Sequence, residues 1–367
     1  MNILYVANMR MPTEKAHGIQ IMKACEAFVH SGHELELIVP NRCSPIKEDP
    51  FTYYGIKSPF KITRLFTADT VEWGALGFVF QSVLFGIVAA IYKEIKKVDV
   101  VYGRDEIVLT MIGILTKKKI IWESHDGAWN IWARYLSRRS SGIVVVTKSA
   151  IDFYKKHNVP EENILAVSNG VDLDDFSNPE SKQEARSRLG LPQDEKIALY
   201  IGKLDGWKGL GTLLEASVLL SDVKVVIIGG EKGHIEKLSK KYPDVIFLGP
   251  MPYNALPNNQ AAGDVLVVPN TAKDPISVLF TSPLKLIAHM ASHSPIVVSD
   301  LPSTRFVADG VALFVKPDDP SALAYGIKSL VDNQALADTI VHGALERVKD
   351  FSWSSRARRI GRFLRKV

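Results

Sequence analysis

The feature that most constrains the fold is an alternation, along nearly the whole chain, of short apolar runs with stretches of helical periodicity. The apolar runs are four to six residues long and rich in Val, Ile and Leu. This alternation is typical of parallel sheets covered by helices. The expected strands occupy residues 3–7, 34–39, 62–66, 98–102, 119–122, 142–146 and 164–167, followed by 196–201, 223–228, 245–248, 265–268, 296–299 and 312–315.

The strands fall into two series, which predicts two domains. At 367 residues the chain is too long for one ordinary core. A polar connection at residues 172–195, with a short helix expected at 184–189, separates the series. We therefore predict an α/β protein of two doubly wound, Rossmann-like domains, with ligands beyond the carboxyl ends of the strands in an interdomain cleft. Helices of the second series are expected at residues 210–220, 283–292, 320–331 and 335–349.

Composition and charge exclude several classes of protein. Hydrophobic residues make up 46% and charged residues 23%, as in ordinary globular chains. The net charge of +5 comes from 45 basic residues interspersed with 40 acidic ones, which argues against a nucleic-acid-binding protein and suits an enzyme with anionic substrates. Cys25 and Cys43 lack metal-type spacing, so neither a disulfide framework nor a zinc site is expected. The N-terminus reads as a strand rather than a signal peptide, and we expect a cytoplasmic protein.

One uncharged stretch, residues 74–92, is long and apolar enough to cross a bilayer. Gly77, Gln81, Ser82 and Gly86 interrupt it, and a basic run at residues 93–97 follows directly before the next strand. These features favour a buried or membrane-touching helix of the first domain over a membrane span.

The segment 202–209, with the sequence Gly-Lys-Leu-Asp-Gly-Trp-Lys-Gly, is the strongest candidate for a binding site. It lies between an expected strand and an expected helix, and its glycines allow the backbone to approach a ligand closely. Lys203 and Lys208 add two cations beside a helix N-terminus, where free N–H groups already favour anions. The pattern predicts a diphosphate ligand, although an ordinary turn with two solvated lysines fits this segment alone equally well.

A second candidate anion site lies at residues 280–286. Ser282 is expected to cap a helix in which Pro283 is the first residue and Lys285 lies in the first turn. A purely structural cap is the alternative for this segment alone. Two such sites at strand ends of one domain together favour a phosphate-bearing ligand.

The motifs and their order resemble the retaining glycosyltransferases of family 4, or glycosyl transferases group 1, which have the GT-B fold. The resemblance covers nearly the whole chain. It implies an acceptor-side domain over residues 1–175, a nucleotide-sugar donor domain over 176–350, and a C-terminal helix, 351–367, that packs back on the first domain. The motifs are Gly202-Lys203-Leu204 with Lys208-Gly209, Val226-Ile227-Ile228-Gly229, Ala261-Ala262-Gly263-Asp264, Ser282-Pro283-Leu284-Lys285, Asp318-Asp319-Pro320, Tyr102-Gly103-Arg104, Glu123-Ser124-His125-Asp126 and Ser168-Asn169-Gly170.

The resemblance also implies roles for particular residues. Lys203 and Lys208 would hold the donor diphosphate, with Lys203 keeping the charge but not the planar fork of the usual arginine. His125 would lie beside the transferred sugar, unless it is a hydrogen-bonded core histidine. His17 and Gly18, in a glycine-containing turn at residues 16–19, and Arg104 would lie on the acceptor side. The implied donor-binding residues are Gly202, Lys203, Lys208, Gly209, Gly229, Met251, Ser282, Pro283, Leu284 and Lys285.

Ala288 departs from the family pattern. The matching position normally carries the Glu that binds the donor ribose, and alanine cannot accept a hydrogen bond from a ribose hydroxyl. Losing a charged hydrogen-bond partner costs about 1.5–3 kcal/mol, which lowers affinity roughly ten- to hundredfold. His289 could replace that Glu only if the helix were rotated.

Basic clusters offer a possible membrane contact. Arg134, Arg138 and Arg139 precede a strand. A solvated amphipathic helix packed through Ile360 and Phe363 is the favoured interpretation of the C-terminal cluster, and attraction to anionic lipid at the inner face of the membrane is the alternative. The C-terminal cluster consists of Arg356, Arg358, Arg359, Arg362, Arg365 and Lys366.

The leading hypothesis is an enzyme that moves a hexose from a UDP- or GDP-linked donor to a glycan, lipid-linked or small-molecule acceptor, as in polysaccharide biosynthesis. The resemblance implies retention of configuration and neither a metal nor a cofactor. Two alternatives stay open: a partner subunit of the same fold impaired at Ala288, and a nucleotide-sugar epimerase. No Gly-x-Gly-x-x-Gly follows either first strand, which disfavours a dinucleotide-dependent oxidoreductase.

Overall fold

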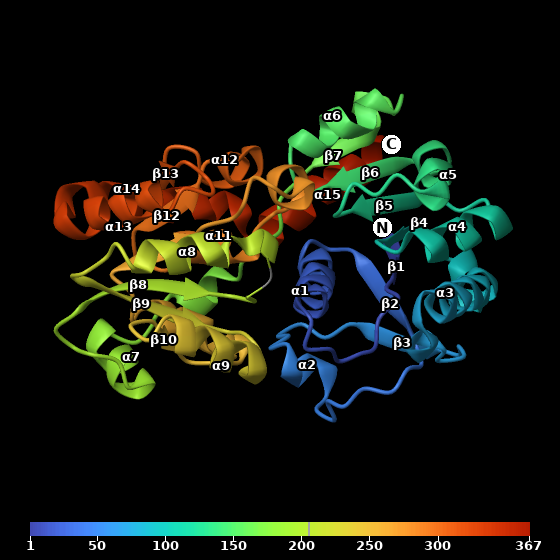
Figure 1. The fold of residues 1–367 in the computed structure, drawn as a ribbon. Coiled ribbons are helices and arrows are strands. Elements are labelled where there is room, and N and C mark those ends of the chain that lie inside the picture. The colour runs from blue at the N-terminus through green and yellow to red at the C-terminus, as the bar shows by residue number, and fades with distance from the viewer. Residues whose placement is uncertain (205) are drawn as a thin grey trace. The chain divides into compact units, whose positions relative to one another are not determined.

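The computed structural model describes residues 1–204 and 206–367, and the chain divides into two compact units. Unit 1 consists of residues Met1–Gly170 and Trp353–Val367, and unit 2 of residues Val171–Ser352. Each unit is built on a parallel sheet covered by helices, as Figure 1 shows. The prediction of two Rossmann-like α/β domains is confirmed.

The sheet of unit 1 has seven parallel strands in the order β3-β2-β1-β4-β5-β6-β7. This order reverses direction between β1 and β4, which pair with Tyr5 opposite Tyr102. The reversal creates the switch point at which ligands of doubly wound sheets bind. The strands are β1 (Asn2–Val6), β2 (Glu34–Pro40), β3 (Lys61–Leu65), β4 (Val100–Gly103), β5 (Ile120–Ser124), β6 (Gly142–Val145) and β7 (Ile164–Ala166).

Helices of unit 1 come from both ends of the chain. The last helix, α15 (Trp353–Lys366), packs against α1 (Ala16–His30) although more than three hundred residues separate them. Figure 1 shows α15 in red beside the green strands β6 and β7. The remaining helices of this unit are α2 (Pro50–Tyr53), α3 (Gly74–Ile91), α4 (Glu106–Leu115), α5 (Ile131–Arg139) and α6 (Ser149–Lys156).

Unit 2 repeats the same topology with six parallel strands in the order β10-β9-β8-β11-β12-β13. Its switch point lies between β8 and β11, which pair with Leu199 opposite Leu266. The strands are β8 (Lys196–Ile201), β9 (Val223–Ile228), β10 (Ile246–Phe247), β11 (Val265–Val268), β12 (Ile296–Ser299) and β13 (Leu313–Val315). The helices are α7 (Lys182–Leu189), α8 (Leu210–Ser217), α9 (Lys232–Lys241), α10 (Leu256–Gln260), α11 (Leu284–Met290), α12 (Pro302–Ala308), α13 (Pro320–Asp332) and α14 (Gln334–Val348).

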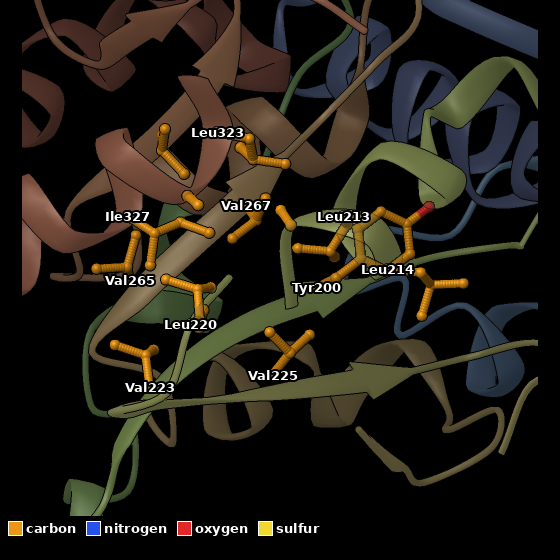
Figure 2. Packing of buried hydrophobic residues seen from close by; sticks show 14 of the residues in the cluster. Tyr200, Leu213, Leu214, Leu220, Val223, Val225, Val265, Val267, Leu323 and Ile327 are labelled. Atoms are coloured by element: carbon orange, nitrogen blue, oxygen red, sulfur yellow. The ribbon is translucent and has the colours of Figure 1, made fainter. Parts of the chain in front are cut away.

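Helices on both faces bury the central strands, such as β4, β6, β11 and β12, completely, which explains why these strands read as continuous apolar runs. In unit 2, Tyr200, Val225 and Val267 on three neighbouring strands pack against Leu213 of α8 and Ile327 of α13 (Figure 2). All five side chains are buried. The packing of this face fixes the position of α8, and with it the segment that joins β8 to α8.

Asp264 anchors the opposite, amino-terminal end of the same sheet. Its carboxylate lies 2.6 Å from Nη2 of the buried Arg186 and 2.7 Å from Nζ of Lys182, and it accepts a hydrogen bond from the amide of Ile197 at 2.7 Å. These bonds join α7 to the first residues of β8 and β11.

Candidate active site

The predicted phosphate-binding segment lies at the switch point of unit 2. Residues 202–209 leave the carboxyl end of β8, and Pro269 and Asn270 leave the carboxyl end of the neighbouring β11. A hollow of about 300 Å³ elsewhere in this unit is lined by Lys196, Asp264 and Pro295, at the amino ends of strands. Ligands of doubly wound sheets bind at the carboxyl ends, so the segment 202–209 marks the candidate site and the hollow does not.

Three glycines allow the backbone segments of this site to pack closely against one another. A Cβ on Gly209, which has φ +69°, would lie 1.7 Å from the carbonyl oxygen of Pro269. A Cβ on Gly229 would lie 2.1 Å from the carbonyl oxygen of Gly202, and Gly202 itself has φ +154°. Side chains at these positions would push the segments apart, so the close approach requires glycine.

Lys285 joins this segment from α11. A Cβ on Gly202 would lie 3.2 Å from the Nζ of Lys285, and that Nζ lies 4.0 Å from the ring centroid of Tyr200. The Tyr200 hydroxyl donates a hydrogen bond of 2.7 Å to the carbonyl oxygen of Lys203. Lys208 lies over the ring of Trp207, 4.8 Å from its centroid, and the side chain of Lys203 is exposed. The structure therefore gathers Gly202, Gly209, Gly229 and Lys285 around one strand end, with Lys203 and Lys208 on the same segment.

Asn270 and Ser277 were missed by the sequence reasoning. Asn270 is 1% exposed, and within the described residues neither atom of its side-chain amide has a hydrogen-bond partner. The buried hydroxyl of Ser277 likewise lacks a partner among residues 1–204 and 206–367. Buried polar groups without partners are costly and mark positions where a ligand can supply the bonds. The available signal was a polar residue directly after β11 at the switch point.

The expected cap at Ser282 is wrong. Helix α11 begins at Leu284, its N-cap position is Pro283, and no side chain caps it. A π-helical turn, η7 (Ile276–Phe280), precedes it, and the Thr281 hydroxyl donates a hydrogen bond of 2.7 Å to the carbonyl oxygen of Ile276. This bond closes the π turn and leaves Thr281 extended, so the chain enters α11 later than the sequence suggests.

Ala288 and His289 lie on the inner side of α11. Ala288 is 2% exposed and belongs to an apolar cluster with Phe176 and Val268. The imidazole Nδ1 of the fully buried His289 lies 2.7 Å from the Gln260 side-chain amide nitrogen. Burial lowers the pKa of His289 to about 3, with a further lowering by the charge of Lys285. His289 is therefore a neutral core residue and does not replace the missing Glu.

Met251 follows β10 in unit 2. It is half-buried and packs on a cluster that includes Leu199, Val226 and Ala262. Gly249, two residues earlier, accepts a hydrogen bond of 2.7 Å from the amide of Gly229 and so connects this region to the segment 202–209.

In unit 1 the buried carboxylate of Glu123 organises the predicted site residues. Nη2 of Arg104 lies 2.8 Å from Glu123 Oε1, Nη2 of Arg356 lies 2.9 Å from it, and Nε2 of His125 lies 2.6 Å from it. The hydroxyl of Tyr102 donates to the second oxygen, Oε2. Since the Glu123 side chain is fully buried, this cluster holds His125 and Arg104 in one place.

Two guanidinium charges surround the single carboxylate of this cluster. Burial alone raises the pKa of Glu123, but the two guanidinium groups of Arg104 and Arg356 outweigh burial and hold that pKa well below its ordinary value. Burial lowers the pKa of His125 to about 4, and the charge of Arg104 acts in the same direction. His125 is therefore neutral near pH 7 with its Nε2 held by Glu123, which leaves Nδ1 for another partner.

The interpretation of Arg356 as a solvated surface residue is wrong. Its side chain is 3% exposed, and its Nε donates a hydrogen bond of 3.1 Å to the carbonyl oxygen of Ser168. Arg359 also donates to a backbone carbonyl, that of Ala166, at 3.1 Å. No local pattern predicts these bonds, because their partners lie more than 180 residues away in sequence.

His17 and Gly18 lie in the first turn of α1, so the expected glycine-containing turn is helical. A Cβ on Gly18 would lie 2.3 Å from the hydroxyl of Tyr54, which explains the glycine by packing alone. Gln20, one turn after His17, accepts a hydrogen bond of 2.7 Å from Nη1 of Arg104. Because residues three apart share a helix face, this bond places the start of α1 beside the Glu123 cluster.

Comparison with known proteins identifies the family. Residues 18–175 match the model described as Glycosyltransferase Family 4, and residues 195–333 match the model described as Glycosyl transferases group 1. The chain belongs to this glycosyltransferase family. The two matches cover most of unit 1 and most of unit 2.

Sequence relatives include several D-inositol 3-phosphate glycosyltransferases. The enzyme of Mycolicibacterium smegmatis is 31% identical over 212 residues, covering 54% of this chain and 46% of the relative. The enzyme of a Nocardioides species is 28% identical over 242 residues, covering 58% of this chain and 50% of the relative. The chain thus spans about half the length of the curated relatives it matches.

Solved structures share the fold over the whole chain. Sucrose-phosphate synthase from Thermosynechococcus elongatus superposes with a TM-score of 0.79 at 19% identity, covering 100% of this chain and 98% of the other. HepE of Anabaena, solved in complex with UDP-glucose, superposes with a TM-score of 0.77 at 15% identity, covering 100% of both chains. At these identities the similarity establishes the fold alone, GT-B.

Proposed function

We propose that the protein transfers a sugar from a nucleotide diphosphate donor, UDP- or GDP-linked, to a sugar-containing acceptor, with retention and without a metal. The observation that carries this proposal is the packing around the carboxyl end of β8. Gly202, Gly209 and Gly229 keep the backbone bare of side chains there, Lys285 lies against Gly202, and Asn270 presents an unpartnered buried amide within the described part of the chain. HepE of Anabaena, which shares the fold, binds UDP-glucose in its solved complex, and this supports the same donor class here.

Charge stabilisation supplies the chemistry. Sugar transfer requires that negative charge on the departing diphosphate be neutralised and that the acceptor hydroxyl be held in place. Lys203, Lys208 and Lys285 provide positive charge for the diphosphate. A neutral His125 donates from Nε2 to Glu123, so its Nδ1 can accept a hydrogen bond from a sugar hydroxyl without adding charge.

A thermal-shift experiment tests the proposal. The full chain is heated with UDP-glucose, UDP-galactose, GDP-mannose or ADP-glucose, each alone. A donor at about a hundred times its Kd stabilises the protein by about 2.7 kcal/mol. The variant Lys285→Gln should lose most of the shift, whereas Lys328→Gln, an exposed lysine paired with Asp222, should keep it. If no nucleotide sugar shifts the wild type, the proposal fails.

Ala288 supports a second candidate, a subunit of the same fold that binds donors weakly and does not turn over. Alanine offers no carboxylate to the ribose hydroxyls at this position, and Ala288 is buried in an apolar cluster. We therefore expect UDP and its 2′,3′-dideoxy analogue to bind with Kd values within about threefold, a difference below about 0.7 kcal/mol. A tenfold preference for UDP would show that another group binds the ribose.

Product analysis separates the two candidates. The proposed enzyme releases UDP or GDP from the stabilising donor when a sugar acceptor is added, and NMR of the product shows the anomeric configuration of the donor. The impaired subunit binds the donor but releases no nucleotide with any acceptor. Ala288→Glu should not rescue it, because the new carboxylate would be buried among apolar side chains.

A further inference from the structure

Helices α3 and α4 of unit 1 carry a large apolar surface that faces solvent. We call it the apolar face. Leu76 is 85% exposed and Ile91 is 74% exposed, at opposite ends of α3. The apolar face consists of Leu76, Phe80, Ile87, Ile91, Ile114 and Leu115. Four of these positions, 76, 80, 87 and 91, follow helical spacing and form one stripe along α3.

The inner side of α3 carries mostly small and polar residues, with Phe85 as its one large apolar side chain. Gln81 donates to the side-chain oxygen of Asn8 at 3.0 Å, and Ser82 accepts from the Asn8 amide at 2.8 Å. Gly86 packs so closely on α4 that a Cβ would lie 2.7 Å from the Cβ of Met111. Leu76, Phe80 and Ile91 of α3 therefore face solvent, whereas a helix of a water-soluble domain turns its apolar stripe to the core. An apolar patch of this kind marks an interaction surface.

The flanks of the apolar face identify its partner. Trp73, 77% exposed, precedes α3 at one end, where an amphipathic ring suits a membrane interface. Lys93, Lys96 and Lys97 follow α3 at the other end, and the exposed Lys117 follows α4. Nζ of Lys118 bonds the carbonyl oxygen of Lys96 at 2.8 Å, so the ends of the two helices and these lysines share one edge. Apolar side chains beside a row of lysines suit a lipid surface with anionic headgroups.

We propose that the protein docks on anionic membranes through the apolar face, with α3 lying in the plane of the headgroups. The segment Val71–Ile91 has the length and hydropathy of a membrane-spanning helix, but 39% of its apolar window is buried against unit 1. The bonds from Gln81 and Ser82 to Asn8 fix one side of α3 to the domain, so only the outer side enters the lipid. The C-terminal helix, for which the sequence offered this role only as the alternative, packs against α1 of the same unit, as the favoured interpretation expects.

Vesicle co-sedimentation of the full chain tests this proposal, which does not depend on the sugar-transfer activity. We expect binding to phosphatidylcholine vesicles that contain phosphatidylglycerol and weaker binding to phosphatidylcholine alone. The double variant Leu76→Asn with Ile91→Asn should bind at least tenfold more weakly, about 1.4 kcal/mol. A matched control, Val218→Asn with Leu219→Asn, changes two exposed apolar residues of unit 2 and should bind as the wild type does.

The lysines are tested separately. Replacing Lys93, Lys96 and Lys117 by glutamine should weaken binding to the anionic vesicles about fivefold per residue and leave binding to phosphatidylcholine unchanged. Sedimentation velocity without lipid tests whether a second copy of this chain binds the apolar face instead. A wild-type dimer that the Leu76→Asn, Ile91→Asn variant dissociates would overturn the proposal, as would wild-type protein that binds neither vesicle.

Discussion

Replacing Glu123 by glutamine would remove one negative charge from the centre of unit 1 with little change in shape. The side chain of Glu123 is fully buried, and the Arg356 and Arg104 side chains around it are 3% and 15% exposed. Glutamine can still bond one or two of its neighbours. It cannot neutralise the two guanidinium groups, which would remain buried without a counter-charge.

The expected cost is large. Removing one partner of a buried ion pair destabilises proteins by about 3–5 kcal/mol, because the remaining charge stays desolvated. Unit 1 contains 170 residues from the first segment and 15 from the last, 185 in all. In a domain of that size each kcal/mol lowers Tm by about 2–4 °C. Glu123→Gln should therefore lower the Tm of this unit by roughly 6–20 °C.

Differential scanning calorimetry and urea denaturation measure the effect, with the two units allowed separate transitions. Asp264→Asn is the matched control in unit 2, since it removes a carboxylate that holds Arg186 and Lys182 and should affect the other transition. The double variant Glu123→Gln, Arg356→Met should be less destabilised than the sum of the single variants, because one stranded charge is gone. A Glu123→Gln protein within 1 kcal/mol of the wild type would refute the reasoning.

Three other predictions concern the candidate site. The free energy of unfolding should fall as the pH drops from 6.5 towards 4, because unfolded His125 and His289 take up protons that the folded residues, with pKa values of about 4 and about 3, do not. His125→Gln should make this part of a urea-denaturation pH profile less steep, and the slope that remains is expected from His289. Gly209→Ala should abolish the donor-induced thermal shift, since its Cβ would meet the Pro269 carbonyl oxygen. It should also destabilise the protein by about 1–3 kcal/mol, the cost of a left-handed backbone at a residue other than glycine. The control variant Gly206→Ala, with no heavy atom near its Cβ, should keep both the shift and the stability. Asn270→Ala should raise the Tm of the free protein, because a buried unpartnered amide costs about 1–3 kcal/mol, and should weaken donor binding measured by calorimetric titration.

The strands were predictable because the helices bury both sides of each sheet. In the described part of the chain, all thirteen strands begin and end within two residues of the expected ranges. A strand that is apolar on both faces carries its signal locally, in consecutive residues such as Val265–Val268. Helix α11 begins at Leu284, one residue after the expected start at 283, but its expected cap at Ser282 was wrong, since the preceding π turn depends on a bond from Thr281 back to Ile276 that a cap pattern does not reveal.

The site was predictable only in part, for a related reason. Glycines and lysines in one short segment are visible in the sequence. The pairing of Glu123 with Arg356 joins positions 233 residues apart, 356 less 123, and neither residue looks different from a surface charge. The apolar face on α3 shows the same limit. The sequence reveals that residues 74–92 are apolar, but only the bonds of Gln81 and Ser82 to Asn8 decide which side of the helix turns inward.

Several arginines and lysines have different roles in this structure, although the net charge counts them alike. Arginine has a planar fork of five donors, so it can satisfy several buried acceptors at once. Arg139 bonds three backbone carbonyls beside α4. Arg186 joins the half-buried carboxylate of Asp264 to a backbone carbonyl, and Arg356 joins the buried carboxylate of Glu123 to another. The positive charges invoked for the diphosphate, at Lys208 and Lys285, are lysines, as are those beside the apolar face. A lysine is a single mobile charge that suits a ligand or a lipid headgroup better than a fixed network. Exchanging Lys for Arg at the ligand segment should therefore change donor affinity, whereas exchanging Arg356 for Lys should change stability.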